Sequence, residues 1–435
     1  MWWQQPALLE SWLDDFLSDA LQRRGMGDLL LDADTHAADL LTQPRHFGFD
    51  SLDMVELARR FAHTLGLDRT GVSDLLLARR SAEGWAGVAR RSLAIDDSTL
   101  CFYSSGSTGE PKPTVHKLDK LQREIAAFQP LLPNPRRIVS TVPAHHIYGF
   151  IWSILLPSEL ALERIRLHPA RSLPANWAKQ LRNDDLIVAT PAVWSMLLAR
   201  QVQLPDIFTG ISSTAPLPAA TASAIRQQYP NATLIEVYGS SETAALAWRQ
   251  QDNAAFTLLP FWTLMQEQDH WKVRDKDDGQ EQQLNDQLQR HDINHISVLR
   301  RTDPVVQIHG NNVNLAQLAA MLQTHADVTE ARVRSDTCDD RTELHYYLVL
   351  QHNPDNVQAW CRAFSNWLTA SLGNIPPPRS VVIAPALPVN ALNKQVAWNA
   401  VQYPLVTGCF RSGFAATTTV VPANDAAAKE DSSAS

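Results

Sequence analysis

A loop of small residues reads Tyr103-Ser104-Ser105-Gly106-Ser107-Thr108-Gly109-Glu110-Pro111-Lys112, and it directly follows the apolar run Leu100-Cys101-Phe102. Such a loop suits a polyphosphate because glycines let the backbone approach closely, N–H groups and hydroxyls face the oxygens, and a lysine neutralises charge. The Walker P-loop spacing G-x-x-x-x-G-K-[ST] is absent from it. The same residues also suit an ordinary flexible loop, so the assignment depends on the rest of the chain.

A second motif reads Tyr238-Gly239-Ser240-Ser241-Glu242-Thr243 and follows a strand-like apolar run at 233–237. An aromatic ring, a glycine, hydroxyls and a carboxylate at a strand end can stack an adenine, hydrogen-bond a phosphate and hold Mg²⁺ through hard oxygen ligands. Two further segments precede this motif, Ser213-Thr214-Ala215-Pro216-Leu217 and Pro143-Ala144-His145-His146-Ile147-Tyr148-Gly149. The order of these segments along the chain indicates more than any one of them alone.

In this order the segments resemble the motifs of the adenylate-forming (AMP-binding) superfamily, which contains acyl-CoA synthetases, aryl-acid ligases and peptide-synthetase adenylation domains. The loop at 103–112 is similar to the nucleotide loop of that superfamily. Residues 238–243 resemble its Y-G-x-T-E motif, with Ser241 in place of threonine. Residues 213–217 resemble G-A-A-P-L, which lies along the adenine, and residues 143–149 resemble P-x-x-H-x-x-G, which lines the acyl pocket of aryl-acid ligases.

The C-terminal third continues the resemblance. Arg301-Thr302-Asp303 and the residues after it resemble the hinge R-x-D-x-x-V/I-K-x-x-G, with Gln307 in place of the lysine. Asp286 stands about fifteen residues before Arg301, where the superfamily has a ribose-binding aspartate, although its neighbours do not match. The final signature L-P-x-T-x-x-G-K is matched by Leu387-Pro388-Val389-Asn390-Ala391-Leu392-Asn393-Lys394, with asparagines replacing the threonine and the glycine.

The resemblance implies a role for each matched residue. The residues expected to bind the nucleotide are Ser104, Ser105, Gly106, Ser107, Thr108, Gly109, Lys112, Thr214, Ala215, Pro216, Tyr238, Gly239, Ser241, Asp286 and Arg301. The expected catalytic residues are Lys394, Glu242, which would also hold the metal, and His146. His145, His146 and Tyr148 would line the acyl pocket, and Asp303 would be the hinge. The alternative for either histidine is that it only satisfies buried backbone groups.

The function implied is that of an ATP-dependent, AMP-forming acid:thiol ligase with Mg²⁺ and CoA as cofactors. Its small-molecule substrate would be an aryl carboxylic acid of the 4-coumarate or 4-hydroxybenzoate type, activated as an acyl-adenylate and transferred to CoA. Two alternatives stay open. The acceptor can be an acyl carrier protein, as in aryl-polyene or pigment biosynthesis, or the chain can be a degenerate, non-catalytic ligase that acts as a carrier or scaffold.

Composition bounds the class of protein. With 435 residues, 45% hydrophobic and 19% charged, the chain is expected to form more than one globular domain. Its net charge of −8 gives no reason to expect a nucleic-acid partner or an anionic membrane. The longest nearly apolar stretch is too short for a membrane span, and the N-terminus does not read as a signal peptide. The four cysteines are scattered without a C-x-x-C pair, so we expect a cytoplasmic enzyme without a structural zinc site or a disulfide framework.

The alternation of short apolar runs and amphipathic stretches predicts an α/β fold. The large domain is expected to have a mostly parallel sheet with flanking helices, followed by a small α+β C-terminal domain and preceded by a helical N-terminal segment. The expected boundaries are 1–95 for the helical segment, which resembles an acyl carrier, 96–300 for a truncated AMP-binding domain, 301–411 for the small mobile domain, and 412–435 for a disordered tail.

The helical segment contains Asp50-Ser51-Leu52, which resembles the D-S-L motif where acyl carrier proteins attach phosphopantetheine. A serine at a helix start exposes its hydroxyl, and the helix dipole favours an attached phosphate. Three interpretations of Ser51 remain: a working carrier, a carrier-like remnant, or an ordinary helix cap.

Overall fold

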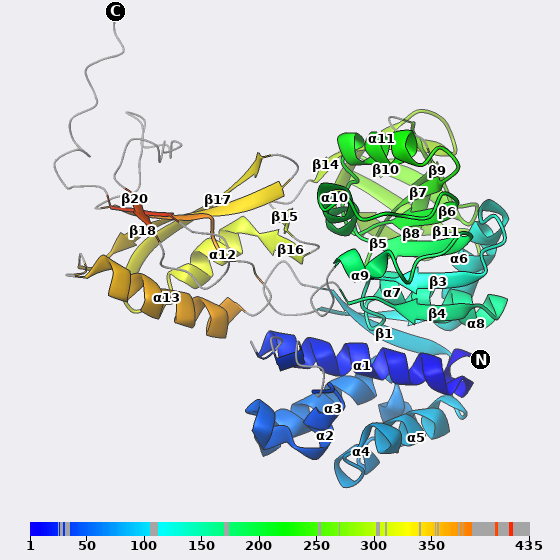
Figure 1. Ribbon diagram of the computed structural model, residues 1–435, viewed down its shortest axis with the longest axis horizontal. Helices are drawn as coiled ribbons and strands as arrows, with labels where there is room; N and C mark the ends of the chain where they lie inside the picture. The colour runs from blue at the N-terminus through cyan, green and yellow to red at the C-terminus, as the bar shows by residue number, and fades with distance from the viewer. Residues whose placement is uncertain are drawn as a thin grey trace, which may run out of the picture. The chain divides into compact units, whose positions relative to one another are not determined.

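The computed structural model describes most of the chain, which divides into two compact units (Figure 1). The described residues are 1–24, 26, 29–30, 35–104, 112–168, 174–250, 254–268, 270–301, 305–308, 311–338, 341–352, 354, 356–372, 375, 377–384, 405–407 and 417–420. Unit 1 contains residues 1–104 and 112–302, and residues 303–435 belong to unit 2.

Unit 1 begins with the helical segment that the sequence predicts. Its elements are η1 (Trp2–Gln4), α1 (Pro6–Arg23), α2 (Asp39–Thr42), η3 (Pro44–Phe47), α3 (Ser51–Leu65), η4 (Leu67–Thr70), α4 (Leu75–Ala78) and α5 (Ala82–Leu93). Asp50 caps α3 in a capping box with Asp53, which satisfies amide groups that the first turn of a helix leaves unpaired.

The helical segment and the sheet share one hydrophobic core. Trp2 packs edge-on against Phe150, with ring centroids 5.1 Å apart. Phe61 of α3 packs against Phe16 of α1 and Trp85 of α5. Because these large side chains are almost fully buried in a core that continues into the sheet, the helices of 1–95 do not form a hydrophobic core of their own.

A hairpin of β1 (Thr99–Ser104) and β2 (Lys112–Lys117) follows, with Ser104 opposite Lys112 at its open end. The central sheet has the order β13-β14-β9-β8-β7-β6-β5-β3-β4. Its strands are β3 (Arg137–Ser140), β4 (Glu163–Arg166), β5 (Asp185–Ala189), β6 (Phe208–Ser212), β7 (Thr233–Ser240), β8 (Ala244–Arg249), β9 (Phe256–Leu258), β13 (Asp286–Arg290) and β14 (His295–Arg301). The strands from β4 to β7 run parallel, as predicted, and those from β7 to β13 run antiparallel.

Helices cover both faces of the parallel half. The helices of this part are α6 (Leu118–Phe128), η5 (Gln129–Leu131), α7 (Ile147–Phe150), η6 (Ile151–Leu155), α8 (Leu156–Leu160), α9 (Pro174–Trp177), α10 (Pro191–Ala199) and α11 (Ala219–Gln228). Successive residues of a strand point to opposite faces. Accordingly Leu186 and Val188 of β5 pack in the core with α1, α6 and η6, whereas Ile187 and Ala189 pack in a second core with α10 and α11. A separate three-stranded sheet consists of β10 (Trp262–Glu267), β11 (His270–Asp275) and β12 (Glu281–Leu284).

Unit 2 is an α+β unit with its own core. Its elements are β15 (Val305–Ile308), β16 (Asn311–Asn314), α12 (Leu315–Leu322), β17 (Val328–Cys338), β18 (Arg341–Leu350), α13 (Val357–Leu372), β19 (Ser380–Ala384), β20 (Leu405–Thr407) and β21 (Thr417–Val420). The larger sheet has the order β17-β18-β19-β21-β20. Strand β21 lies within the tail that composition predicts to be disordered. Its residues are three threonines and a valine, β-branched residues that favour strands, so disorder is not the outcome for these four positions.

Candidate active site

The ends of three neighbouring parallel strands gather the predicted segments. Strands β5, β6 and β7 are adjacent, so their carboxyl ends lie at one edge of the sheet, where ligands bind in open α/β folds. The loop 213–217 follows β6, and the turn 238–243 overlaps the end of β7. Ser213 Oγ donates to the carbonyl of Val237 at 2.9 Å, and the amide of Leu217 donates to Glu236 Oε1 at 3.0 Å. Two of the sequence-predicted segments are therefore tied directly to each other.

The turn 238–243 is shaped by close backbone packing. A Cβ atom on Gly239 would lie 2.0 Å from the carbonyl oxygen of Ala244, so only glycine fits there. Ser240 Oγ accepts the amides of Glu242 and Thr243 at 3.2 and 3.3 Å and so holds the turn. Glu242 is an exposed residue of this turn.

The strand after the nucleotide loop contacts the same turn. Nε2 of His116, on β2, lies 2.7 Å from the carbonyl oxygen of Ser241. A carbonyl oxygen can only accept a hydrogen bond, so Nε2 is the donor. Burial lowers the pKa of His116, although the carbonyl raises it, so the ring is a neutral donor at pH 7. This hydrogen bond joins the β1–β2 hairpin, which carries Ser104 and Lys112, to the motif at the end of β7.

The predicted ribose residues also come together. Tyr238 donates its hydroxyl to Asp286 Oδ2 at 2.7 Å. Asp286 begins β13, and its cross-strand partner in β14 is Arg301. The structure thus brings together the phenol of Tyr238, the carboxylate of Asp286 and the backbone of Arg301. These three residues come from separate parts of the sequence.

Thr214 has a strained backbone and a buried hydroxyl. Its φ of 81° is uncommon for a β-branched residue, and strain of this kind clusters at ligand sites. Its Oγ1 is buried and has no hydrogen-bond partner among the described residues. The structure therefore places an unpaired polar atom in the segment that the sequence assigns to adenine.

The segment 143–149 carries the three expected acyl-pocket residues. A Cβ atom on Gly149 would lie 2.0 Å from the carbonyl oxygen of Pro143, which folds the segment tightly. The Tyr148 hydroxyl lies 3.0 Å from the carbonyl oxygens of Ala189 and Ile211, at the ends of β5 and β6, and burial raises its pKa well above the ordinary value. Tyr148 therefore lies at the same strand ends, with its hydroxyl engaged by the backbone.

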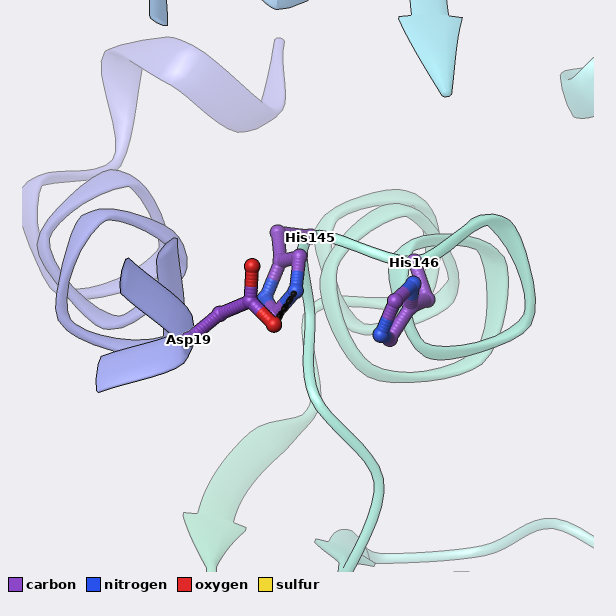
Figure 2. Close-up of side chains that lie close together, drawn as sticks. All are labelled: Asp19, His145 and His146. Carbon is purple, nitrogen blue, oxygen red and sulfur yellow. Dashed lines mark ion pairs between the residues drawn. The ribbon is translucent and has the colours of Figure 1, made fainter. Parts of the chain in front are cut away.

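His145 and His146 differ in their surroundings. His145 is buried, and its Nε2 lies 3.6 Å from Asp19 Oδ1 of α1 (Figure 2). The ring of His146 lies beside that of His145, with centroids 4.2 Å apart, and the residue is exposed. Desolvation and the neighbouring His145 lower the pKa of His146, so this ring is neutral at pH 7.

Asp19, His145 and His146 each offer a ligand atom, and these atoms lie within 4.8 Å of one another. Arg23 and Arg60 already bind the same Asp19 carboxylate, at 2.7 and 3.1 Å. Two guanidinium groups at the carboxylate disfavour a divalent cation there. We therefore do not assign a metal to this cluster.

Several predicted residues cannot be placed. Ser105, Gly106, Ser107, Thr108, Gly109, Asp303 and Lys394 lie outside the described residues. For Ser104 and Arg301 only the backbone is described, and Ala215 and Pro216 lie in the loop after β6. Ser51 is the first residue of α3 and is exposed.

Sequence reasoning missed the contribution of α1. Asp15 and Asp19 are one turn apart on this helix, and both are buried. Asp15 Oδ2 accepts the amide of Ala144 at 2.8 Å, next to His145. The only signal in the sequence was the presence of carboxylates, Glu10, Asp14, Asp15 and Asp19, among the apolar residues of this helix, and this does not show which of them are buried or what they contact.

A sequence profile of the AMP-binding enzyme family matches residues 40–287. The chain belongs to this family. The match starts inside the segment 1–95, so Ser51 lies within it and α1 lies before it. The chain is therefore an AMP-binding enzyme. Its motifs at 213–217 and 238–243 lie in the matched region.

Curated relatives and solved structures agree with this membership. A 4-coumarate--CoA ligase of Cereibacter sphaeroides is 32% identical over 315 residues, which cover 71% of this chain and 72% of that protein. A 4-coumarate--CoA ligase of Halorhodospira halophila is 31% identical over 79% of this chain and 87% of that protein. The fold is similar to that of an o-succinylbenzoate CoA synthetase of Bacillus subtilis, with a TM-score of 0.57, 18% identity, and 69% and 68% of the two chains covered. A malonyl-CoA ligase gives a TM-score of 0.54.

Among the described residues, no helix combines the length and the apolar character needed to cross a membrane.

Proposed function

We propose that this chain is an ATP-dependent ligase that activates an aryl carboxylic acid, of the 4-coumarate or 4-hydroxybenzoate type, and transfers the acyl group to CoA. The observation that carries the proposal is that Tyr238, at the end of β7, binds Asp286, whose cross-strand partner is Arg301, in the fold of adenylate-forming ligases. The loop 213–217 is hydrogen-bonded to the same strand β7. The names of the relatives that are about one-third identical support the aryl acid.

The reaction has two steps. In the first, a carboxylate oxygen of the acid attacks the α-phosphorus of ATP, the bond to the bridging oxygen breaks, and pyrophosphate leaves. In the second, the sulfur of a thiol attacks the acyl carbon, its proton passes to a base, and the bond to AMP breaks. Both steps bring anions together, so positioned donors and cations supply much of the catalysis.

The residues of this chain have distinct roles in the proposal. Asp286 and Arg301 hold the ribose, and the strained loop at Thr214 lies along the adenine. Glu242 and Ser241 offer the hard oxygen atoms that Mg²⁺ prefers, and the metal would neutralise phosphate charge when it is bound. His146 is exposed and its lowered pKa keeps the imidazole neutral, so a ring nitrogen can accept a hydrogen bond from the thiol and orient the sulfur toward the acyl carbon.

The test is pyrophosphate release across a panel of benzoic, cinnamic and fatty acids, with and without CoA. Release that requires 4-coumarate or a hydroxybenzoate and rises with CoA is the expected result. Release with medium-chain fatty acids alone would refute the aryl acid. If ATP–pyrophosphate exchange is absent with every acid, the non-catalytic scaffold becomes the better interpretation.

The second candidate is transfer to an acyl carrier, with phosphopantetheine on Ser51 or on a separate protein. Its support is the exposed hydroxyl at the first position of α3, followed by Leu52 and Val55, which are 78% and 47% exposed. The shared core of the helical segment and the sheet argues against a carrier that moves independently. Intact mass after coexpression with a phosphopantetheinyl transferase tests whether Ser51 is the carrier, because an unchanged mass excludes modification of Ser51.

A further inference from the structure

Helix α1 lies outside the region that the AMP-binding profile matches, yet it contacts the loop that carries His146. Asp15 and Asp19 point from one face of α1 toward this loop. Asp15 binds the loop backbone through the amide of Ala144 at 2.8 Å. Asp19 reaches the side chain of the next residue, His145, and Figure 2 shows this carboxylate directed at the ring.

Both carboxylates are compensated by arginines. Asp15 binds Arg166 at 3.0 Å, and Asp19 binds Arg23 and Arg60. Burial alone would raise the pKa of Asp19, but His145, Arg23 and Arg60 outweigh it and hold that pKa well below its usual value. His145 therefore contributes to the compensation of this buried charge together with the two guanidinium groups, so the two side chains stabilise each other.

The contact between Asp19 and His145 bears on the positions of both histidine rings. Neither ring nitrogen of His145 has a hydrogen bond among the described residues, so the 3.6 Å approach to Asp19 is an electrostatic contact. The ring lies between Phe16 and His146, at centroid distances of 6.5 and 4.2 Å. The His145 ring therefore lies between the Asp19 carboxylate and the neighbouring rings. Because His146 lies against the His145 ring, a change in the contact between Asp19 and His145 is expected to shift His146.

We propose that Asp19 and His145 are positioning residues that hold His146 for transfer of the acyl group to the thiol, with Asp15 fixing the backbone of the same loop. This inference rests on the proposed function. It assigns to an N-terminal helix outside the family match a part in the second half-reaction, and none in binding of the nucleotide.

The experiment separates the two half-reactions in the full-length protein. ATP–pyrophosphate exchange with 4-coumarate reports adenylation, and single-turnover transfer from synthetic 4-coumaroyl-AMP to CoA reports the thiol step. His145→Phe removes the contact with Asp19 but keeps a ring between Phe16 and His146, and it leaves Asp19 paired with its arginines. Because His145 belongs to the segment expected to line the acyl pocket, both half-reactions can slow, and we expect transfer to lose about tenfold more than exchange does.

Coupling to His146 is tested with a double mutant. His145→Phe is expected to have no further effect on transfer in the His146→Ala background, because residues that act through one group are not additive. His145→Gln, whose amide can still donate to Asp19, is expected to transfer faster than His145→Phe. A role of His145 in filling space alone predicts the reverse order.

The matched control is Asp185→Asn, which breaks a buried ion pair with Arg137, at 2.7 Å. Both residues stand at the amino ends of the parallel strands β3 and β5, away from the carboxyl ends where the candidate site lies. It is expected to lower the melting temperature without selectivity for transfer. Equal losses in both half-reactions of His145→Phe, or the same loss with and without His146, would overturn the inference. A wild-type protein without exchange would instead refute the proposed function.

Discussion

At the scale of single residues, Glu124 shows how burial sets a pKa. This carboxyl lies on α6 and is buried, and its Oε2 accepts the amide of Ala245 at 2.9 Å, next to the turn 238–243. Burial raises its pKa to about 7, from a usual 4.5, and the hydrogen bond offsets only part of that rise. No cation that the structure describes pairs with it.

The raised pKa predicts a pH dependence of stability. A carboxyl with a raised folded pKa contributes stability that is fully present below about pH 4.5 and is lost as the pH rises through about 7. Glu124→Gln keeps the acceptor for Ala245 and never ionises. From pH 5 to pH 8 we expect the variant to gain up to about 3 kcal/mol of unfolding free energy relative to the wild type. Urea unfolding of both proteins at the two pH values measures this, and parallel curves would show that Glu124 does not titrate there.

Lys394 lies outside the described residues, so its role rests on the resemblance of 387–394 to the family's final signature. If this lysine contacts the carboxylate and the α-phosphate, Lys394→Ala slows adenylation by about a hundredfold or more, because a cation at the developing charge is lost. Transfer from preformed acyl-adenylate to CoA is expected to stay within a few-fold of the wild type. An equal loss in both steps would contradict the assignment.

At the scale of elements, the turn 238–243 depends on one glycine. Gly239→Ala places a Cβ atom against the carbonyl of Ala244, and backbone atoms cannot move aside cheaply. We expect a loss of about 2 kcal/mol or more in stability and a raised KM for ATP. Gly87→Ala is the control, because nothing lies within 4 Å of its Cβ on helix α5, and it is expected to stabilise by about 0.5–1 kcal/mol. Thermal unfolding and ATP titrations compare the two, and a tolerated Gly239→Ala would show that the turn can shift.

Elements with a strong apolar period were predictable from the sequence. The helices at 118–128 and 357–372 have apolar residues at helical spacing, and the strand at 233–240 contains the apolar run 233–237 that the sequence marks as strand-like. The antiparallel strands after β7 were not expected, since strands such as β12 and β13 carry mostly polar residues and gain their order from pairing with neighbours.

For the candidate site, too, the sequence predicts the residues that belong to a motif but not the contacts that depend on tertiary packing. Tyr238, Asp286 and Arg301 were predictable because motifs and spacing mark them. Asp19 was not, because its partner His145 is far away in sequence and only the packing of α1 brings the two together. Contacts that tertiary structure alone creates leave no local pattern in a sequence.

At the scale of the whole molecule, the buried cores divide between the two units. The clusters that contain α1, α6, α10 and the central sheet include only residues of unit 1, and the cluster around β18 and α13 includes only residues of unit 2. A unit whose core is complete within itself is expected to fold without the other. Residues 1–95 do not meet this condition, because Trp2, Phe16 and Phe61 pack in the core of the sheet. Residues 1–302 meet it, because they contain all the clusters of unit 1.

This difference predicts the behaviour of two fragments. A protein that ends at residue 302 is expected to unfold cooperatively, near the midpoint of unit 1 in the full chain, whereas residues 1–95 alone are expected to expose apolar surface and unfold without a sharp transition. Circular dichroism during heating measures both. The 1–302 fragment lacks Lys394, so it is also expected to show no acid-dependent pyrophosphate release. A stable 1–95 fragment would restore the independent carrier module, and pyrophosphate release by 1–302 would place the catalytic cation within unit 1.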